Sequence, residues 1–427
     1  MNQPSPQTPT SFPVDSPFVY RSGNLYCEDV SLAAVAAAAG TPVYVYSRAE
    51  ILSRARTLVA TAAEVVANSL VCYAVKANGN VHLLRLLGEA GLGADVTSGG
   101  ELFLAQQAGI PAARTIFSGV GKQPAEIAEA LLAGIRAIHV ESEMELAAIA
   151  AEAERLDVVA SIGVRVNPNI SAATHPYIST GLHGHKFGVP RERAIGILRA
   201  AAAHPHLRPV GLAAHIGSQI TDLDPFGQAV GFLVELAEEM WREGIALEYI
   251  DAGGGLGIDY QGSAPDAAAW VRTVGPQVGA AGYGLVIEPG RSIVGRAGAL
   301  LTRVVYTKEQ GAKQFVIVDA GMTDLIRPTL YQAYHPIVPV AETDGEQIVD
   351  IVGPICETSD FLARDRALPP AAQSDLLAVL HAGAYGFAMS SNYNGHLRPA
   401  EVLVEGDTFH VIRRRQTYDT LIAGTDV

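Results

Sequence analysis

The chemically most informative residue of the 427-residue chain is Lys76, which ends the apolar run that begins at Val71. The chain then breaks into Asn78-Gly79-Asn80, a sequence typical of a turn. A lysine amine that is shielded from water can form a Schiff base with a carbonyl cofactor. A lysine also ends many strands simply because its charge is soluble, so Lys76 alone does not decide between the two roles.

A glycine-rich segment from Gly253 to Gly257 is a second candidate for chemistry, as a phosphate-binding loop. Glycine lets backbone N–H groups approach an anion without interference from a side chain. The alternatives are a plain tight turn and a dinucleotide-binding fingerprint. The fingerprint needs an acidic residue well after the loop, and Asp259 comes too soon for it.

Three further polar residues, His215, Glu288 and Arg291, follow other apolar segments. His215 is either a core histidine or a flat ring that stacks on an aromatic cofactor. Glu288 ends an apolar run, where a buried carboxylate needs a cation beside it or becomes protonated. Arg291 either forms a structural ion pair or binds a substrate carboxylate.

The elements that position these residues alternate between short apolar strands and amphipathic helices over residues 43–295. Ser-x-x-Glu pairs such as Ser98/Glu101 and Ser142/Glu145 predict helix starts, as does Ser47/Glu50. Eight parallel strands that alternate with helices predict an α/β fold, the (β/α)8 TIM-type barrel, whose active site lies at the carboxyl ends of the strands. The predicted strands are 71–76, 94–97, 115–118, 137–140, 162–167, 211–216, 249–252 and 285–288.

The pattern changes after residue 296, where short strand-like runs follow one another without long helices. This pattern predicts a mainly antiparallel β domain over residues 296–427, after a barrel over residues 43–295. Residues 1–42 are expected to form a flexible tail, rich in Pro, Ser, Thr and Gln, and then a segment that packs on the β domain. The predicted strands of the β domain are 300–306, 315–318, 347–352, 376–380, 401–404 and 409–413.

Composition excludes several classes of protein. The net charge of -14 argues against nucleic acid and against anionic membranes as partners. The longest apolar stretch, 32–39, is too short to span a bilayer, and the first residues lack the features of a signal peptide. Three widely separated cysteines, Cys27, Cys72 and Cys356, are typical of the cytoplasm. No carboxylate or cysteine near His183 and His185 completes a metal site, so no metal is predicted.

Taken together, the motifs resemble the pyridoxal-phosphate-dependent decarboxylases of the alanine-racemase fold, and among them the diaminopimelate decarboxylase family. The resemblance extends from about Tyr44 to Arg398. The motifs shared with the wider group are Tyr73-Ala-Val-Lys76-Ala-Asn78, His215-Ile-Gly-Ser218-Gln, Gly253–Gly257 and Glu288-Pro-Gly-Arg291. The motifs specific to the narrower family are Lys186-Phe187-Gly188, Arg327-Pro-Thr-Leu-Tyr331, Cys356-Glu357-Thr-Ser-Asp360 and Gly383-Ala-Tyr385-Gly386.

The resemblance implies a role in binding pyridoxal 5'-phosphate for each of the first motifs. Lys76 would hold the cofactor as a Schiff base, His215 would stack on its ring, and Glu288 would pair with the protonated ring nitrogen. That protonation makes the ring an electron sink for decarboxylation, whereas the related racemases place an arginine there. The phosphate would be held by Ser218, Gly253, Gly254, Gly255 and the backbone of Glu288, Pro289, Gly290 and Arg291, and Tyr385 would contact both cofactor and substrate.

The resemblance also implies the substrate, meso-diaminopimelate, which loses CO2 at its D-centre to give L-lysine in the last step of lysine synthesis. Its far carboxylate would be bound by Arg291, Arg327 and Tyr331, and its far ammonium by Glu357. Cys356 would protonate the carbanion. Family members are homodimers with shared active sites, in which Cys356 and Glu357 reach into the site of the partner.

Several related proteins are alternatives. Ornithine and arginine decarboxylases share the fold, but their substrates lack a second carboxylate, and they typically have aspartate where this chain has Glu357. Carboxynorspermidine decarboxylases and decarboxylases of antibiotic pathways keep the cofactor motifs and differ in the loops. A non-catalytic regulator that resembles the antizyme inhibitors is disfavoured, because Lys76, His215, Glu288 and Cys356 are all present.

Overall fold

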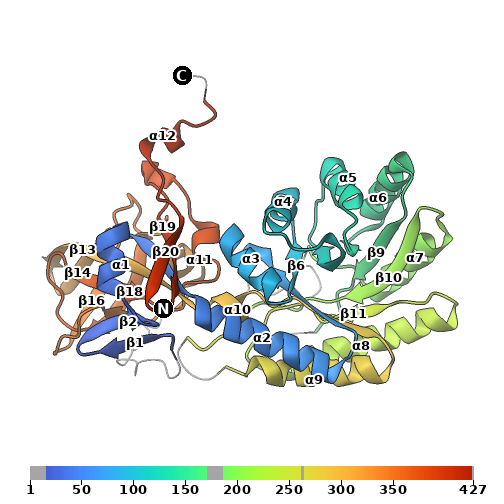
Figure 1. The fold of residues 1–427 in the computed structure, drawn as a ribbon, viewed down its shortest axis with the longest axis horizontal. Helices are drawn as coiled ribbons and strands as arrows, with labels where there is room; N and C mark the ends of the chain where they lie inside the picture. The colour runs from blue at the N-terminus through green and yellow to red at the C-terminus, as the bar shows by residue number, and fades with distance from the viewer. Residues whose placement is uncertain (1–15, 171–185, 261–263, 426–427) are drawn as a thin grey trace. The chain divides into compact units, whose positions relative to one another are not determined.

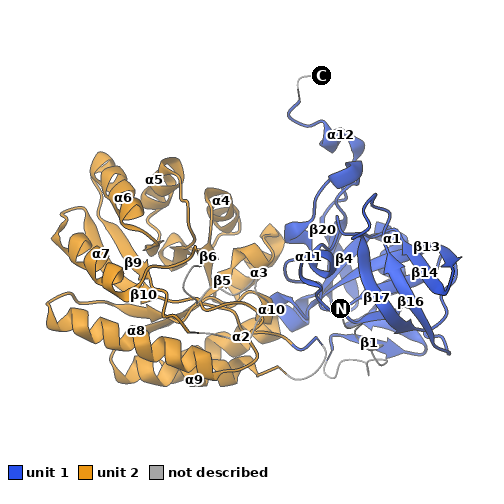
Figure 2. Cartoon of the chain, turned by 180° about the vertical axis from the view of Figure 1, so that it is seen from behind, with its two compact units in different colours: residues 1–51, 259–262, 293–427 blue, residues 52–258, 263–292 orange. Residues whose placement is uncertain are grey.

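The computed structural model describes residues 16–170, 186–260 and 264–425, which are drawn in Figure 1. They form two compact units, coloured in Figure 2. Unit 1 comprises residues 1–51, 259–262 and 293–427, and unit 2 comprises residues 52–258 and 263–292. Most of the predicted N-terminal tail, and also His183 and His185, lie outside the described residues.

Unit 2 contains a closed barrel of eight parallel strands, so the predicted fold class is confirmed. Every predicted barrel strand overlaps an observed one. The strands are β5 (Ser69–Ala74), β6 (Gly93–Val96), β7 (Thr115–Phe117), β8 (Ala137–Val140), β9 (Ala160–Arg165), β10 (Leu207–Ala213), β11 (Tyr249–Asp251) and β12 (Gly284–Ile287). Three strands end before the residue of chemical interest that was predicted to lie in them. Strand β5 stops at Ala74, so Lys76 lies in the 3-10 turn Val75–Ala77, and His215 and Glu288 follow β10 and β12.

Helices connect the barrel strands and lie outside them (Figure 1). The predicted caps are confirmed, since Ser98 Oγ accepts the Glu101 N–H at 3.2 Å and Ser142 Oγ accepts the Glu145 N–H at 3.1 Å. Each cap satisfies an N–H group that the first helical turn leaves without a partner. The helices are α2 (Arg48–Val65), α3 (Val81–Glu89), α4 (Gly99–Gln107), α5 (Pro124–Ala133), α6 (Glu143–Leu156), α7 (Arg191–Ala203), α8 (Asp224–Arg242), α9 (Ala267–Ala280) and α10 (Arg291–Val294).

The inside of the barrel is filled by side chains, among them the fully buried Tyr249 of β11. Two glycines on neighbouring strands make room for it and for His139. A Cβ atom on Gly211 would collide with the Tyr249 ring, and a Cβ atom on Gly163 would collide with the His139 ring. These glycines therefore allow two large polar rings to lie side by side in the barrel core.

Unit 1 is built on a nine-stranded, mainly antiparallel sheet, as predicted for the C-terminal part of the chain. Two of its strand pairs, β4 with β19 and β14 with β16, are parallel. A second, three-stranded sheet is formed by β1–β3. The elements are β1 (Phe18–Arg21), β2 (Asn24–Cys27), β3 (Val30–Ser31), α1 (Leu32–Ala39), β4 (Val43–Ser47), β13 (Gly298–Gln310), β14 (Lys313–Val318), α11 (Arg327–Tyr331), β15 (Ile337–Pro339), β16 (Gln347–Val352), β17 (Phe361–Leu368), β18 (Leu376–Val379), β19 (Ala400–Glu405), β20 (Thr408–Arg413) and α12 (Tyr418–Leu421).

Several strands of unit 1 differ from the sequence analysis, among them the short β3 and β15, which were not predicted, and the longer β4 and β17. Strand β4 falls in the range given to the barrel, but it pairs with β13 and β19. It is buried along its whole length, so its composition does not reveal which sheet it joins. Strand β17 was not predicted, because Arg364, Asp365 and Arg366 interrupt its apolar pattern. The buried Arg366 side chain donates a hydrogen bond to the His335 carbonyl at 2.8 Å, which compensates its burial.

The N-terminal segment of unit 1 shares a core with the larger sheet. Phe18 and Leu25 belong to the same buried cluster as Val43 of β4 and Val402 of β19. Among the described residues, none of the helices has the length and apolar character needed to cross a membrane.

Candidate active site

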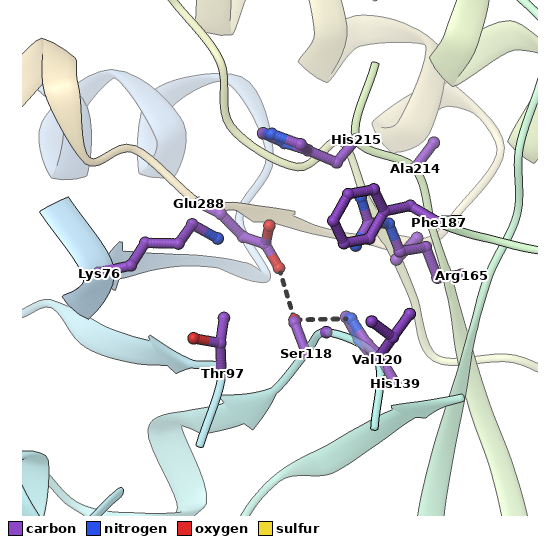
Figure 3. A pocket seen from close by; sticks show the side chains of 12 residues that line it. Lys76, Thr97, Ser118, Val120, His139, Arg165, Phe187, Ala214, His215 and Glu288 are labelled. Atoms are coloured by element: carbon purple, nitrogen blue, oxygen red, sulfur yellow. Dashed lines mark hydrogen bonds between the residues drawn. The ribbon is translucent and has the colours of Figure 1, made fainter. Parts of the chain in front are cut away.

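A cavity of about 320 Å³ opens at the carboxyl ends of the barrel strands, where the sequence analysis expected the active site (Figure 3). Each polar side chain that lines it ends or follows a barrel strand. The lining residues that bear functional groups are Lys76, Thr97, Ser118, His139, Arg165, His215 and Glu288.

Lys76 enters this cavity from the turn that follows β5. Its Nζ atom lies 3.0 Å from Asp95 Oδ2, and its side chain is 35% exposed, whereas that of Asp95 is fully buried. Asp95 of β6 lies opposite Ala74 of β5 in the register of the two strands. The buried carboxylate thus orients an amine that a small molecule in the cavity can still reach.

Glu288 is buried at the end of β12 and faces the cavity. Burial raises its pKa well above the usual range, and the neighbouring carboxyl groups of Asp251 and Asp95 raise the pKa further. Burial also raises the pKa of Asp251 to about 7. Ser118 Oγ donates a hydrogen bond to Glu288 Oε1 at 3.2 Å. An acid in this setting is stabilised as an anion by any cation that binds beside it.

His215 follows β10 and presents a neutral ring to the cavity. Its Nδ1 atom accepts the backbone N–H of Gly254 at 3.1 Å, which fixes the ring. Burial lowers the pKa of His215 well below the usual range, and Arg165 and Lys76 lower the pKa further. A neutral, fixed ring is suited to stacking on an aromatic ligand.

The glycine-rich loop after β11 lies between the loops that follow β10 and β12. Cβ atoms on Gly253, Gly254 and Gly255 would collide with the carbonyls of Ala214, Glu288 and Gly217, respectively. The Gly253 N–H donates to Asp251 Oδ1 at 2.8 Å, and the Gly254 N–H donates to His215. The glycines therefore allow close packing of three loops, and two of their N–H groups bind within the protein.

Arg291 begins α10 beside this loop, and Ser218 lies close to it. Arg291 Nη2 donates to Ser218 Oγ at 3.0 Å, and Arg291 is buried. The preceding Pro289 carbonyl accepts the Ala74 N–H at 3.1 Å, which ties the loop to the end of β5. A buried guanidinium and a hydroxyl beside a glycine loop form a suitable set of donors for an anion.

A second buried ion pair shapes the other side of the cavity. Glu141 Oε1 accepts from Arg165 Nη1 at 2.9 Å, and Glu141 Oε2 accepts the Gly188 N–H at 2.7 Å. The Arg165 guanidinium also lies 4.8 Å from the centre of the Phe187 ring. Glu141 thus holds Phe187 and Arg165 in the cavity wall.

Of the residues expected to bind the far end of the substrate, Arg291 lies in unit 2, and Arg327, Tyr331 and Glu357 lie in unit 1. Arg327 of α11 is buried, and its Nη1 atom donates to Tyr260 Oη at 2.9 Å and to His335 Nε2 at 2.8 Å. Tyr331 ends the same helix. Thr329 Oγ1 donates to the Ser359 carbonyl at 2.6 Å, so α11 is bonded to the loop that contains Cys356 and Glu357.

That loop exposes both Cys356 and Glu357. Tyr393 Oη donates to Glu357 Oε1 at 2.8 Å, and Asp360, which is buried, accepts the backbone N–H groups of Met322 and Ile355. Asp360 therefore anchors the loop to the rest of the unit, while Cys356 stays exposed.

Tyr385 adopts a left-handed backbone with φ of 57°, which is uncommon for a residue with a side chain.

The sequence analysis gave no role to four polar residues that line the cavity, Thr97, Ser118, His139 and Arg165, or to three acids bonded or close to the lining residues, Asp95, Glu141 and Asp251. Their common signal is position, since each lies in or directly after a predicted barrel strand. Polar residues at strand ends are common, however, and only closure of the barrel brings these ones together.

These groups match the chemical groups of pyridoxal phosphate. Lys76 supplies the amine and His215 the flat ring. Glu288 supplies an acid that needs a cation, and the Ser218–Arg291 pair beside the glycine loop supplies donors to a phosphate.

Comparisons with known proteins agree with this site. Residues 28–295 match the family model described as "Pyridoxal-dependent decarboxylase, pyridoxal binding domain". The chain is 47% identical to a diaminopimelate decarboxylase of Aquifex aeolicus, over 94% of this chain and 96% of the relative. It is 46% identical to that of Pseudomonas aeruginosa, over 95% and 98%.

Solved structures are also similar along nearly the whole chain. Diaminopimelate decarboxylase of M. jannaschii in co-complex with L-lysine matches with a TM-score of 0.92 and 36% identity, covering 97% of this chain and 98% of that one. The Helicobacter pylori enzyme complexed with L-lysine matches with a TM-score of 0.87 and 39% identity, covering 91% and 98%.

Proposed function

Because the chain belongs to the diaminopimelate decarboxylase family of pyridoxal-dependent decarboxylases, we propose that it removes CO2 from the D-centre of meso-diaminopimelate and releases L-lysine, the last step of lysine synthesis. Its cofactor is pyridoxal phosphate. The observation that carries the proposal is the cavity in which Lys76, His215 and Glu288 lie together.

When bound, the cofactor supplies an electron sink for the bond that breaks as CO2 leaves. Lys76 Nζ holds the cofactor covalently, and Asp95, 3.0 Å away, orients that amine. Glu288 pairs with the protonated ring nitrogen. This role is supported by the raised pKa of Glu288, because such an acid is ionised at neutral pH only beside a cation. His215 stacks on the ring.

The phosphate is held by the donors that converge after β10, β11 and β12. These are the side chains of Ser218 and Arg291 and the backbone N–H groups of Gly255, Gly290 and Arg291. The backbone of Gly253, Gly254, Glu288 and Pro289 shapes the same loops but donates nothing to the phosphate, because proline has no N–H and the other three N–H groups bind Asp251, His215 and the Gly253 carbonyl. The hydrogen bond from Arg291 to Ser218 supports this role, because it directs two donor groups to one place. Tyr385 contacts the cofactor and the substrate.

Specificity for the far end of the substrate comes from a guanidinium and an acid in unit 1. Arg327 and Tyr331, with Arg291, bind the far carboxylate, and Glu357 binds the far ammonium. The two bonds that Arg327 makes to Tyr260 and His335 support this role, since they fix the guanidinium in advance. Contacts remote from the reacting carbon decide which end of the substrate reacts.

Cys356 donates the proton that replaces CO2, and it does so at the site of a partner subunit in a homodimer. The exposure of Cys356 and Glu357 supports this arrangement, because a second copy can cover both. The three free cysteines support a cytoplasmic location for the enzyme.

The function is tested by CO2 release from purified protein with added pyridoxal phosphate. We expect release from meso-diaminopimelate, with L-lysine as product, and none from L,L-diaminopimelate, ornithine or arginine. Release from ornithine or arginine would leave the cofactor roles intact and refute those of Arg327, Tyr331 and Glu357. No release from any of the four would refute the proposed reaction.

The shared site is tested by mixing two inactive variants, Lys76→Ala and Cys356→Ala, under conditions that exchange subunits. A mixed dimer then has one site with both residues intact, so random mixing should restore about a quarter of the wild-type activity. Cys356→Ala mixed with Glu357→Gln is the control, since every site then lacks one partner residue. If neither mixture regains activity, the sites are not shared between subunits.

A further inference from the structure

A chain of hydrogen bonds runs from the barrel core to Glu288, through residues to which the proposed mechanism gives no role. Figure 3 shows its two bonds at Ser118. Tyr249 Oη lies 2.9 Å from His139 Nε2, and His139 Nδ1 lies 3.4 Å from Ser118 Oγ. Ser118 Oγ lies 3.2 Å from Glu288 Oε1. All four side chains are buried, with exposures of 0% for Tyr249, 1% for His139, 5% for Ser118 and 7% for Glu288.

The direction of every bond in this chain follows from the one hydrogen that each group can give. Ser118 has a single O–H, and it is donated to Glu288. The contact between Ser118 and His139 therefore requires Nδ1–H as the donor. A neutral ring protonated at Nδ1 has an acceptor at Nε2, so the Tyr249 O–H donates there. All donors point toward Glu288.

His139 has to be neutral for this arrangement, and its surroundings keep it so. Burial, together with the charges of Lys122 and Arg165, lowers the pKa of His139 to about 3. The approach of Asp251 Oδ2 to within 3.9 Å of Nδ1 is therefore not an ion pair.

A metal ion is the competing explanation, because ligand atoms of His139, Asp251 and Glu288 lie within 4.8 Å of one another. Both ring nitrogens of His139 already have hydrogen-bond partners, in Ser118 and Tyr249. A metal ligand needs a free nitrogen lone pair, so the hydrogen-bond chain accounts for the cluster better.

We propose that Ser118, His139 and Tyr249 are positioning residues that hold the Glu288 carboxylate against the ring nitrogen of the cofactor. The inference rests on the proposed role of Glu288 and extends it. A hydrogen bond donated to a carboxylate favours its ionised form and fixes its orientation. Glu288 needs both effects. The acids Asp95 and Asp251 disfavour its ionised form, and Lys76 and Arg165 attract its carboxylate from other directions.

The first test removes only the hydroxyl next to Glu288, with Ser118→Ala, and returns it with Ser118→Thr. We expect Ser118→Ala to lower kcat about tenfold or more with little change in KM, because the lost bond is to a charged group. The visible absorbance of the bound cofactor should change with pH over a range where that of the wild type is constant, because the variant Glu288 binds its own proton more tightly. Ser118→Thr should restore both properties.

The second test acts farther along the chain. His139→Asn keeps an N–H donor close to the position of Nδ1, whereas His139→Leu removes both nitrogens, and thermal melting shows which variants are folded. We expect His139→Leu to reproduce the absorbance profile of Ser118→Ala, and His139→Asn to resemble the wild type. If His139→Leu does not fold, the Ser118→Ala variant alone tests the proposal.

A folded Ser118→Ala variant with wild-type kcat and a wild-type absorbance profile would overturn the proposal. So would a Glu288→Gln variant whose absorbance equals that of the wild type, because Glu288 would then not face the ring. Wild-type protein that binds pyridoxal phosphate but releases no CO2 from meso-diaminopimelate would instead refute the proposed function, and the absorbance comparison would still test the hydrogen-bond chain.

Discussion

Three carboxylic acids, Asp95, Asp251 and Glu288, are buried around the amine of Lys76 and the guanidinium of Arg165. Burial raises the pKa of two of them, Asp251 and Glu288, so those two hold their protons more tightly than acids in water. A positively charged ring nitrogen is attracted to such a group of acids. At the scale of single residues, the raised pKa values of Asp251 and Glu288 thus favour the binding of a cation in the cavity.

Replacing Lys76 tests the most important single residue. Lys76→Ala should abolish turnover and the visible absorbance of the covalently held cofactor, because no other amine takes its place. Lys76→Arg is the matched control, since it keeps a cation beside Asp95 but cannot form the covalent link. Lys76→Arg should melt close to the wild type, whereas Lys76→Ala removes the cation beside the buried Asp95 and should melt at a lower temperature. Turnover by Lys76→Arg at the wild-type rate would contradict the covalent role.

At the scale of elements, the loop after β11 depends on glycine for packing as much as for ligand binding. Gly253 and Gly255 have φ values of 69° and 106°, a region that side chains disfavour. Both lie against backbone carbonyls of the loop after β10, and Gly254 lies against the Glu288 carbonyl after β12. Backbone carbonyls cannot move aside as a flexible side chain can. The three loops therefore form one rigid base for the candidate phosphate site.

Gly255→Ala should both destabilise the protein and weaken cofactor binding. The new Cβ atom would collide with the Gly217 carbonyl, and the backbone strain alone costs roughly 1–3 kcal/mol. Gly196→Ala in α7 is the matched control, because a Cβ atom there has open space and alanine favours a helix. Thermal melting and titration with pyridoxal phosphate measure the two effects. Equal behaviour of the two variants would show that the loop tolerates a side chain.

At the scale of the whole molecule, the stability of the chain depends on buried titratable groups in unit 1 as well as in unit 2. Unit 1 contains a buried acid, Asp324, whose Oδ2 atom accepts the Gly321 N–H at 2.9 Å. Burial, together with the neighbouring Asp319, raises the pKa of Asp324 from its ordinary value of 3.8 to about 7. The folded chain therefore keeps a proton on Asp324 that the unfolded chain releases.

This difference predicts how stability depends on pH. Between 3.8 and about 7 the folded state binds more protons than the unfolded state, so Asp324 makes the free energy of unfolding fall as pH rises. Asp324→Asn keeps an acceptor for Gly321 but does not titrate, so its stability should fall less over this range, by on the order of a few kcal/mol. Exposed Asp407→Asn is the control. Parallel stability curves for Asp324→Asn and the wild type would contradict the raised pKa.

The sequence by itself determined the features that short segments encode. Alternating strand and helix patterns predicted the barrel, and the Ser-x-x-Glu pairs predicted helix starts that the Ser98 and Ser142 caps confirm. The lysine after β5, the glycine run after β11 and Glu288 after β12 were recognisable because each stands beside a strongly apolar strand. Local pattern and local chemistry reinforce each other in such segments.

Only the tertiary structure decided which of these residues meet. Ser118 and Glu288 are 170 positions apart and His139 and Tyr249 are 110 apart, yet they form one chain of hydrogen bonds. The same holds for β4, whose buried sequence suits either sheet and which joins β13 and β19. Such pairs depend on strand register and on the closure of the barrel, and these are set by packing between distant segments that no local pattern contains.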